Sequence, residues 1–126
     1  MTTYSYNRQV TPPAPYVHVA IQTPESELAV SDVPALLDSA ADVTVVPARV
    51  VRQLHLSPLG EVAVTGFDGE VTIAVAYLVQ LAIRQLGAEL FKVLASEQEP
   101  HVLLGRDVLN RHRVVMDGPQ LRLEIS

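Results

Sequence analysis

Hydrophobic and polar residues alternate along most of the chain in short runs, and prolines or glycines interrupt these runs at close spacing. Short runs rich in β-branched residues and bounded by turn residues predict β-strands. The predicted strands span residues 16–22, 33–38, 43–47, 61–66, 70–83, 89–96, 101–105, 113–117 and 121–125. Many short strands with little helix predict an all-β fold, either a closed barrel or a sandwich.

A helical pattern is present in only two segments. Within residues 47–56, Pro47 suits the first position of a helix, and Val50, Val51 and Leu54 fall on one face. The second segment, residues 106–112, is about two turns long at 3.6 residues per turn. The sequence therefore predicts a β fold that carries two short helices.

The length of the chain and its opening segment suggest a simple domain organisation. A chain of 126 residues can bury one hydrophobic core, and it contains neither an internal repeat nor a linker. Residues 1–15 are polar and rich in proline, which is typical of an extended arm. We therefore expect an arm over residues 1–15 and one folded domain over residues 16–126.

One predicted hairpin stands out, because its tip combines Gly66, Phe67, Asp68 and Gly69. Asp-Gly between alternating strands is among the strongest short signals for a β-hairpin. An ordinary surface turn would explain this pattern. A mobile cover would explain it equally well, since the glycines permit bending and Phe67 would contact a ligand.

Composition and charge exclude several classes of function. The formal net charge is −5 and no basic block is present, so nucleic acid is not an expected partner. Without cysteine, the chain has no disulfide, thiolate metal site or cysteine nucleophile. The longest apolar region, residues 71–83, is interrupted by Gln80 and is shorter than the ~20 residues of a membrane helix. Because no signal peptide is evident either, we expect a soluble cytoplasmic protein.

The sequence gives little support for a metal site or for a serine nucleophile. The four histidines are scattered without the spacing of metal ligands, so neither a metal nor another cofactor is expected. Ser39 lacks the flanking glycines of a hydrolase nucleophile. The remaining candidate is Asp38, which follows an apolar run directly. A carboxylate at the end of a buried strand is costly to ionise unless it is paired, hydrogen-bonded or used in chemistry.

Three elements, in this order, resemble the retropepsin family of retroviral-type aspartic proteases. They are 36-LLDSAADVTVVP-47, the glycine-bearing hairpin, and 102-VLLGRDVL-109. In that family an apolar pair precedes Asp-Thr/Ser-Gly-Ala-Asp, a flap hairpin follows, and an apolar-apolar-Gly-Arg-Asp/Asn motif precedes a short helix. The resemblance covers about residues 16–125 and points to a single-domain member of the bacterial type.

The resemblance implies an aspartic endopeptidase whose catalytic carboxylate is Asp38. Hydrolysis without a metal needs one carboxylate to activate water and a second, protonated one to polarise the peptide carbonyl. This chain has one such motif, so the second carboxylate would come from another copy. A homodimer with its active site on the two-fold axis follows, and its other partner would be a peptide or protein substrate.

The resemblance also assigns roles around Asp38. The hydroxyl of Ser39 would hydrogen-bond across the dimer, Asp42 would bind substrate backbone and pair with Arg106, and residues 66–69 would form the flap tip. Asp42 and Arg106 also have simpler interpretations. Asp42 could cap a turn, and Arg106 could be a solvated charge at the start of a helix. The arm of residues 1–15 could either contact the partner subunit or be removed by self-processing.

One residue departs from the family pattern, because Ala40 stands where the family has glycine. The added methyl occupies space beside the substrate and the partner loop, and it would be strained if the backbone angle φ were positive. An alternative function therefore stays open beside catalysis. The chain could be a catalytically impaired, dimeric domain that binds peptides.

Overall fold

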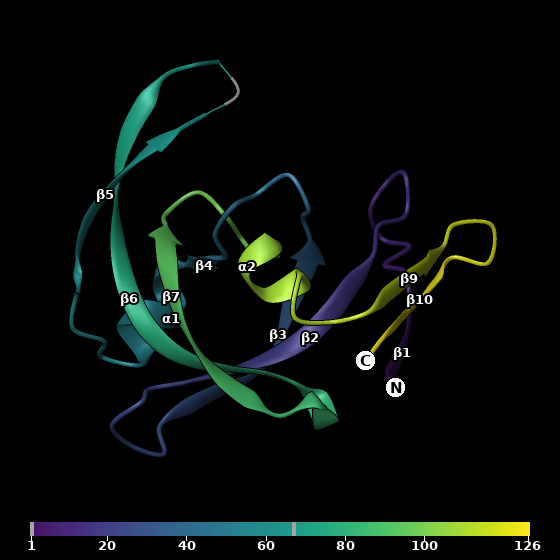
Figure 1. Cartoon of the computed structure of the whole chain (residues 1–126), viewed down its shortest axis with the longest axis horizontal. Helices are drawn as coiled ribbons and strands as arrows, with labels where there is room; N and C mark the ends of the chain where they lie inside the picture. Colours follow the sequence, from purple (N-terminus) through teal and green to yellow (C-terminus); the bar gives the residue numbers. More distant parts are fainter. Residues whose placement is uncertain (1, 67) are drawn as a thin grey trace.

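The computed structural model describes residues 2–66 and 68–126, and six of its strands close into a barrel (Figure 1). The pairing of β2 with β6 closes the ring, in which β2, β3, β8, β4, β7 and β6 follow one another. Their bounds are Tyr16–Gln22 for β2, Ala29–Leu37 for β3, Val102–Leu104 for β8, Val45–Pro47 for β4, Ala88–Ser96 for β7 and Val71–Ile83 for β6. The predicted all-β barrel is confirmed.

The predicted hairpin is formed by β5, Gly60–Thr65, and the first half of β6. It extends away from the barrel as a long curved ribbon (Figure 1). At its tip the Gly66 amide donates to the carbonyl of Glu70 at 2.9 Å, and Gly69 adopts a φ of 78° that favours glycine. The Phe67 position, expected to contact a ligand, lies outside the described residues.

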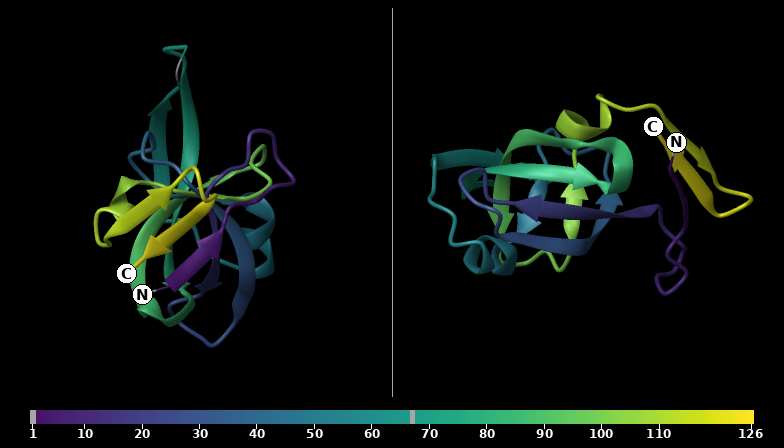
Figure 2. Two further views of the ribbon diagram at one scale, coloured as in Figure 1. Left: turned by 90° about the vertical axis from the view of Figure 1, so that its right-hand side faces the viewer. Right: turned by 90° about the horizontal axis from the view of Figure 1, so that it is seen from below.

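A second, three-stranded sheet joins the two ends of the chain, which lie side by side in Figure 2. It consists of β1, Thr2–Ser5, paired with β10, Arg122–Ile125, which pairs in turn with β9, Val114–Asp117. Tyr4 of β1 is only 5% exposed, and burial raises the pKa of its hydroxyl. Part of the expected arm is thus packed on the body, which the sequence did not predict. The boundary at residue 15 stays a prediction.

The two predicted helices are present as α1, Ala48–Gln53, and α2, Arg106–Leu109, and a single 3₁₀ turn, η1, spans Arg84–Leu86. Val50, Val51 and Leu54 are buried on one face, as predicted. Pro47 ends β4 with an extended ψ of 138° and is the N-cap of α1, one position earlier than the predicted first helical position, because its fixed φ suits either place. None of the helices in the described residues is both long and apolar enough to cross a membrane.

The barrel interior follows from the alternation of side chains along the strands. In β2, Val17, Val19 and Ile21 are buried and the residues between them are partly exposed. β3 begins at Ala29, four residues earlier than residue 33 of the prediction. The alternation fails there because the pairing with β2 shifts register, and Asp32 takes a φ of 54°.

Candidate active site

The backbone of Asp38 is fixed by the end of a parallel strand pair. β3 and β8 run side by side, and directly after β3 the Asp38 amide donates to the carbonyl of Leu104 at 3.0 Å. The carbonyl of Asp38 accepts from the Ala41 amide at 3.1 Å. Its side-chain Oδ1 accepts from the Ala40 amide, also at 3.1 Å. The carboxylate therefore sits in a tight turn that orients one of its oxygens.

Ala40, which departs from the family glycine, fits the loop without backbone strain. The positive φ values of the described non-glycine residues occur elsewhere, at Asp32, His55, Arg84 and Leu121. Ala40 and its neighbour Ser39 are both exposed. The methyl group of Ala40 therefore lowers the stability of the isolated chain little. It instead takes up space that would be open to a molecule approaching the loop.

Arg106 ties the Asp38 loop to the start of α2. Its Nη2 pairs with Oδ1 of Asp42 at 2.6 Å, and its Nη1 donates to the carbonyl of Ser39 at 2.8 Å. Its backbone amide donates to the carbonyl of Ala41 at 2.9 Å. The structure therefore brings Asp38, Ser39, Ala40, Asp42 and Arg106 together in one loop region.

We expect the replacement Arg106→Leu to lower the free energy of unfolding of the chain by about 1 kcal/mol or less. The side chains of Arg106 and Asp42 are 46% and 82% exposed, and water weakens an ion pair that is so accessible. Urea unfolding measures the change. Arg52→Leu is the control, because Arg52 forms an ion pair with Glu97 that is also exposed. A loss of about 3 kcal/mol or more would contradict the exposed geometry.

Sequence analysis missed a buried polar network behind this loop. The fully buried Thr44 donates through Oγ1 to Oδ1 of Asp107 at 2.8 Å and accepts from the Gly105 amide at 3.1 Å. Its backbone amide donates to Oδ2 of Asp107 at 3.1 Å. Asp107 also accepts from the amide of Val108, at 2.9 Å. The available signal was a lone threonine within the apolar run 43–46.

Gly105 lets two backbone segments come into direct contact. A Cβ atom at this position would lie 2.8 Å from the carbonyl carbon of Val43 and 3.0 Å from the carbonyl oxygen of Ala41. Real Cβ atoms do not approach backbone so closely, so only glycine fits without a shift. The segment behind the Asp38 loop is thus packed tightly against it.

A cavity of about 550 Å³ separates the hairpin from the barrel wall. The hairpin contributes Val64 and Thr72 to its lining, and the wall contributes Val45 and Leu103. Leu103 pairs with Leu36, which stands two residues before Asp38. The cavity therefore reaches β8, which pairs with β3 just before Asp38, but its lining includes neither Asp38 nor any other residue of the Asp38 loop.

The hairpin tip forms a turn of its own. Gly66, Asp68 and Gly69 are exposed, and Oδ1 of Asp68 accepts from the amide of Glu70 at 3.0 Å. The hydrogen bonds of these described tip residues stay within the turn and do not reach the Asp38 loop.

The closed barrel, with an aspartate-bearing loop after β3 and a Gly-Arg helix start behind it, defines a retropepsin-like aspartic protease fold. The family described as "gag-polyprotein putative aspartyl protease" matches residues 27–111. The chain belongs to this family of aspartic peptidases. No curated protein sequence matches the chain significantly.

Three solved structures resemble the chain in fold. EIAV protease, in complex with the inhibitor HBY-793, has a TM-score of 0.60 and 20% identity, over 86% of this chain and 93% of that one. A retropepsin-like aspartic protease from Rickettsia conorii has a TM-score of 0.65 and 13% identity, over 97% and 86%. The retroviral protease-like domain of Ddi1 from Leishmania major has a TM-score of 0.52 and 17% identity, over 88% of each chain.

Proposed function

We propose that the chain is an aspartic endopeptidase that acts as a homodimer, with one Asp38 from each subunit in a shared active site. The observation that carries the proposal is the position of Asp38, held by the Leu104 carbonyl and the Ala40 amide in a chain of an aspartic peptidase family. One carboxylate activates water and the other polarises the peptide carbonyl. Since the chain has one such motif, the second carboxylate comes from a second copy.

The chemistry of the pair follows from the repulsion between like charges. Two carboxylates at close range do not both ionise, so they share one proton and take opposite roles. Oδ1 of Asp38 is engaged by the Ala40 amide, which leaves Oδ2 to face the water or the shared proton. Ionised Asp38 then removes a proton from water as the water oxygen attacks the peptide carbon. The partner's Asp38 donates its proton to the carbonyl oxygen, which gives a tetrahedral diol. The C–N bond then breaks as Asp38 passes the proton it took from water to the leaving nitrogen, and the partner's Asp38 takes a proton back from the diol.

The neighbouring residues support peptide binding in this proposal. Arg106 occupies Oδ1 of Asp42, and the other oxygen of Asp42 is available to a substrate amide. The exposed hydroxyl of Ser39 reaches across the two-fold axis and supports the carboxylate pair. The hairpin acts as a flap over the cavity, with residues 66–69 at its tip. A substrate side chain would occupy that cavity.

The test of the proposed function is cleavage of a mixed peptide library between about pH 4 and pH 7, the range in which carboxyl pairs act as acid and base. Cleavage at internal peptide bonds, blocked by a statine-type transition-state mimic, supports an endopeptidase. The absence of cleavage together with saturable peptide binding would favour the second candidate function.

That second candidate is a catalytically impaired, dimeric domain that binds peptides, and Ala40 is the observation that favours it. The exposed methyl group lies two residues from Asp38, on a loop that would face both substrate and partner. A displacement of reacting groups by about 1 Å can lower a rate by ~100-fold. A domain of this kind would retain the fold and the dimer while cleaving slowly or not at all.

We expect the replacement Ala40→Gly to raise the rate of peptide cleavage, by up to ~100-fold, with little change in stability. The negative φ of Ala40 means that glycine relieves no backbone strain, so the gain would come from the space opened to substrate. Initial rates on one peptide measure the effect. The exposed Ala63, replaced by glycine in β5, is the control. If Ala40→Gly cleaves no faster than the parent, the methyl group does not limit catalysis.

Dimerisation gives an independent prediction. Sedimentation velocity at micromolar concentration should show a species of twice the 13.7 kDa monomer mass. Its dissociation on dilution should be accompanied by loss of peptide cleavage, because each subunit supplies half of the carboxylate pair. A chain that stays monomeric at every concentration while it cleaves peptides would rule out the shared active site.

A further inference from the structure

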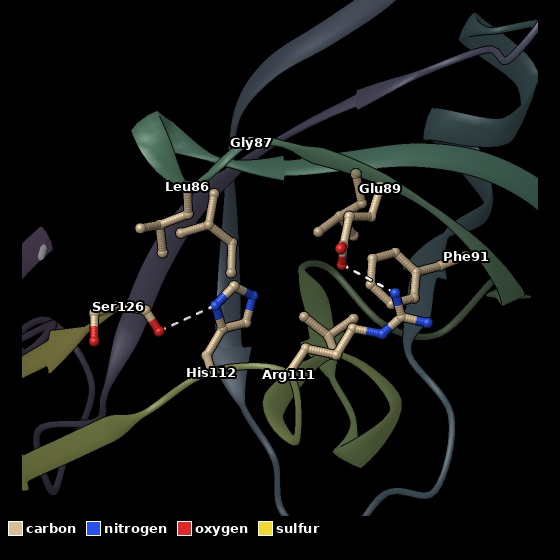
Figure 3. A pocket seen from close by; sticks show the side chains of 10 residues that line it. Leu86, Gly87, Glu89, Phe91, Arg111, His112 and Ser126 are labelled. Atoms are coloured by element: carbon tan, nitrogen blue, oxygen red, sulfur yellow. Dashed lines mark hydrogen bonds and ion pairs between the residues drawn. The ribbon is translucent and has the colours of Figure 1, made fainter.

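A second cavity, of about 250 Å³, lies apart from the Asp38 loop and from the larger cavity (Figure 3). It is bounded by the ends of β6 and β7, the 3₁₀ turn between them, α2 with the residues that follow it, and Ser126. None of its lining residues lines the larger cavity beneath the hairpin. None of them belongs to the Asp38 loop either.

The inner walls of this cavity are formed by apolar side chains, whereas its mouth is polar. Leu81, Ile83, Phe91 and Val108 are all buried members of the hydrophobic core and form its walls together with Leu86. A buried cavity of about 150 Å³ accommodates benzene, so 250 Å³ corresponds to about ten non-hydrogen atoms. An apolar body of that size, such as a phenyl ring with a short polar group, fits the available space.

Arg111 supplies a fixed donor at the mouth. Its Nη1 pairs with Oε2 of Glu89 at 3.0 Å, and its guanidinium carbon lies 4.7 Å from the centre of the Phe91 ring. These two contacts hold the guanidinium plane in place (Figure 3). Within the described residues, the Glu89 contact is the only side-chain hydrogen bond of Arg111. A guanidinium has five N–H donors, so most of them remain for a ligand.

His112 supplies an acceptor on the other side of the mouth. Its Nδ1 lies 3.3 Å from the main-chain carbonyl oxygen of Ser126. A carbonyl oxygen only accepts hydrogen bonds, so Nδ1 is the donor in this contact, and when the ring carries a single proton Nε2 is an acceptor. In Figure 3 this second nitrogen is turned toward the side on which Glu89 and Arg111 lie.

From these groups we propose that the cavity binds a small monocarboxylic acid with an apolar body of about eight carbon atoms. One carboxyl oxygen accepts from Arg111, and the acid proton lies between the other oxygen and Nε2 of His112. Arg111 is already paired with Glu89, so the acid is taken up together with its proton, which His112 shares. A dianion such as phosphate would face Glu89 without compensation and is excluded on that ground.

Calorimetric titration of the full chain with phenylacetate, which has ten non-hydrogen atoms, tests the proposal. We expect saturable binding of one molecule per chain, with a dissociation constant of about 1 mM or lower. Phenylacetamide has the same size but carries no acid group, and it should bind at least about tenfold more weakly. Phenethylamine, which is cationic, should not bind.

Variants locate the binding at this cavity. Arg111→Gln and His112→Gln should each weaken phenylacetate binding by about tenfold or more, whereas Arg122→Gln on the exposed side of β10 should not. Thermal unfolding checks that each variant is folded, and Arg111→Lys replaces Arg111→Gln if the latter is not. The proposal is overturned if the parent shows no saturable binding, if acid and amide bind equally, or if the Arg111 and His112 variants bind like the parent. None of these readouts depends on peptide cleavage.

Discussion

Replacement of Asp38 by asparagine should lower the rate of peptide cleavage by about 1,000-fold or more, whichever residue stands at position 40. Asparagine keeps the size of the side chain, and its amide oxygen can still accept from the Ala40 amide, so the turn is preserved. It cannot take a proton from water or share one with its partner, and such acid–base steps contribute ~100- to 10,000-fold to a rate. Initial rates on a single peptide, with thermal unfolding to show that the fold persists, measure the effect.

Asp117→Asn is a matched control for this replacement. Oδ1 of Asp117 also accepts from a backbone amide in a turn, that of Gln120 at 3.1 Å, but the residue belongs to β9 and not to the Asp38 loop. The control should retain the parent's rate. If Asp38→Asn also retained it, Asp38 would not be a catalytic aspartate and the endopeptidase proposal would fail.

Thr44→Val should lower the free energy of unfolding by about 2–4 kcal/mol and the melting temperature by roughly 10 °C. Valine matches threonine in shape but offers no hydroxyl, so the amide of Gly105 and the carboxylate of Asp107 both lose a partner inside the protein. A buried polar group without a partner costs about 1–3 kcal/mol, and more if it is charged. Urea unfolding and thermal melting measure the loss.

The exposed Thr65 provides the comparison for this buried threonine. Thr65→Val on β5 changes the same chemical group at the surface and should alter stability by no more than about 0.5 kcal/mol. Equal stability of Thr44→Val and the parent would mean that water satisfies the Gly105 amide and Asp107, and that the network does not hold the Asp38 loop in place.

Most of the barrel could be predicted from sequence because each strand buries one face. The alternation in residues 16–22 gave the bounds of β2 without error, and the Asp-Gly pair gave the hairpin. β1 was missed because its strand pattern, Thr-Thr-Tyr-Ser, contains only one large apolar residue. Its stability comes from pairing with β10 at the far end of the chain, a contact that local pattern does not encode.

The candidate site was predictable to a different extent. The proximity of Asp42 and Arg106 followed from the family resemblance, since their pairing depends on residues 64 positions apart. Thr44 and Asp107 are 63 positions apart, and neither has a periodic or spacing signal that would mark it as buried and paired. Only the folded backbone, where Gly105 permits close approach, brings them together.

The 13-residue strand β6 belongs to two structural units at once. Residues 71–75 pair with β5 alone. Residues 76–82 pair with β7, and residues 80–82 among them pair with β2 as well. Amide protons in the first part can exchange with solvent when only the hairpin opens, while those in the second part require the barrel itself to unfold. We therefore expect the two halves of this strand to differ in their free energy of opening, with the outer half able to open while the barrel stays intact.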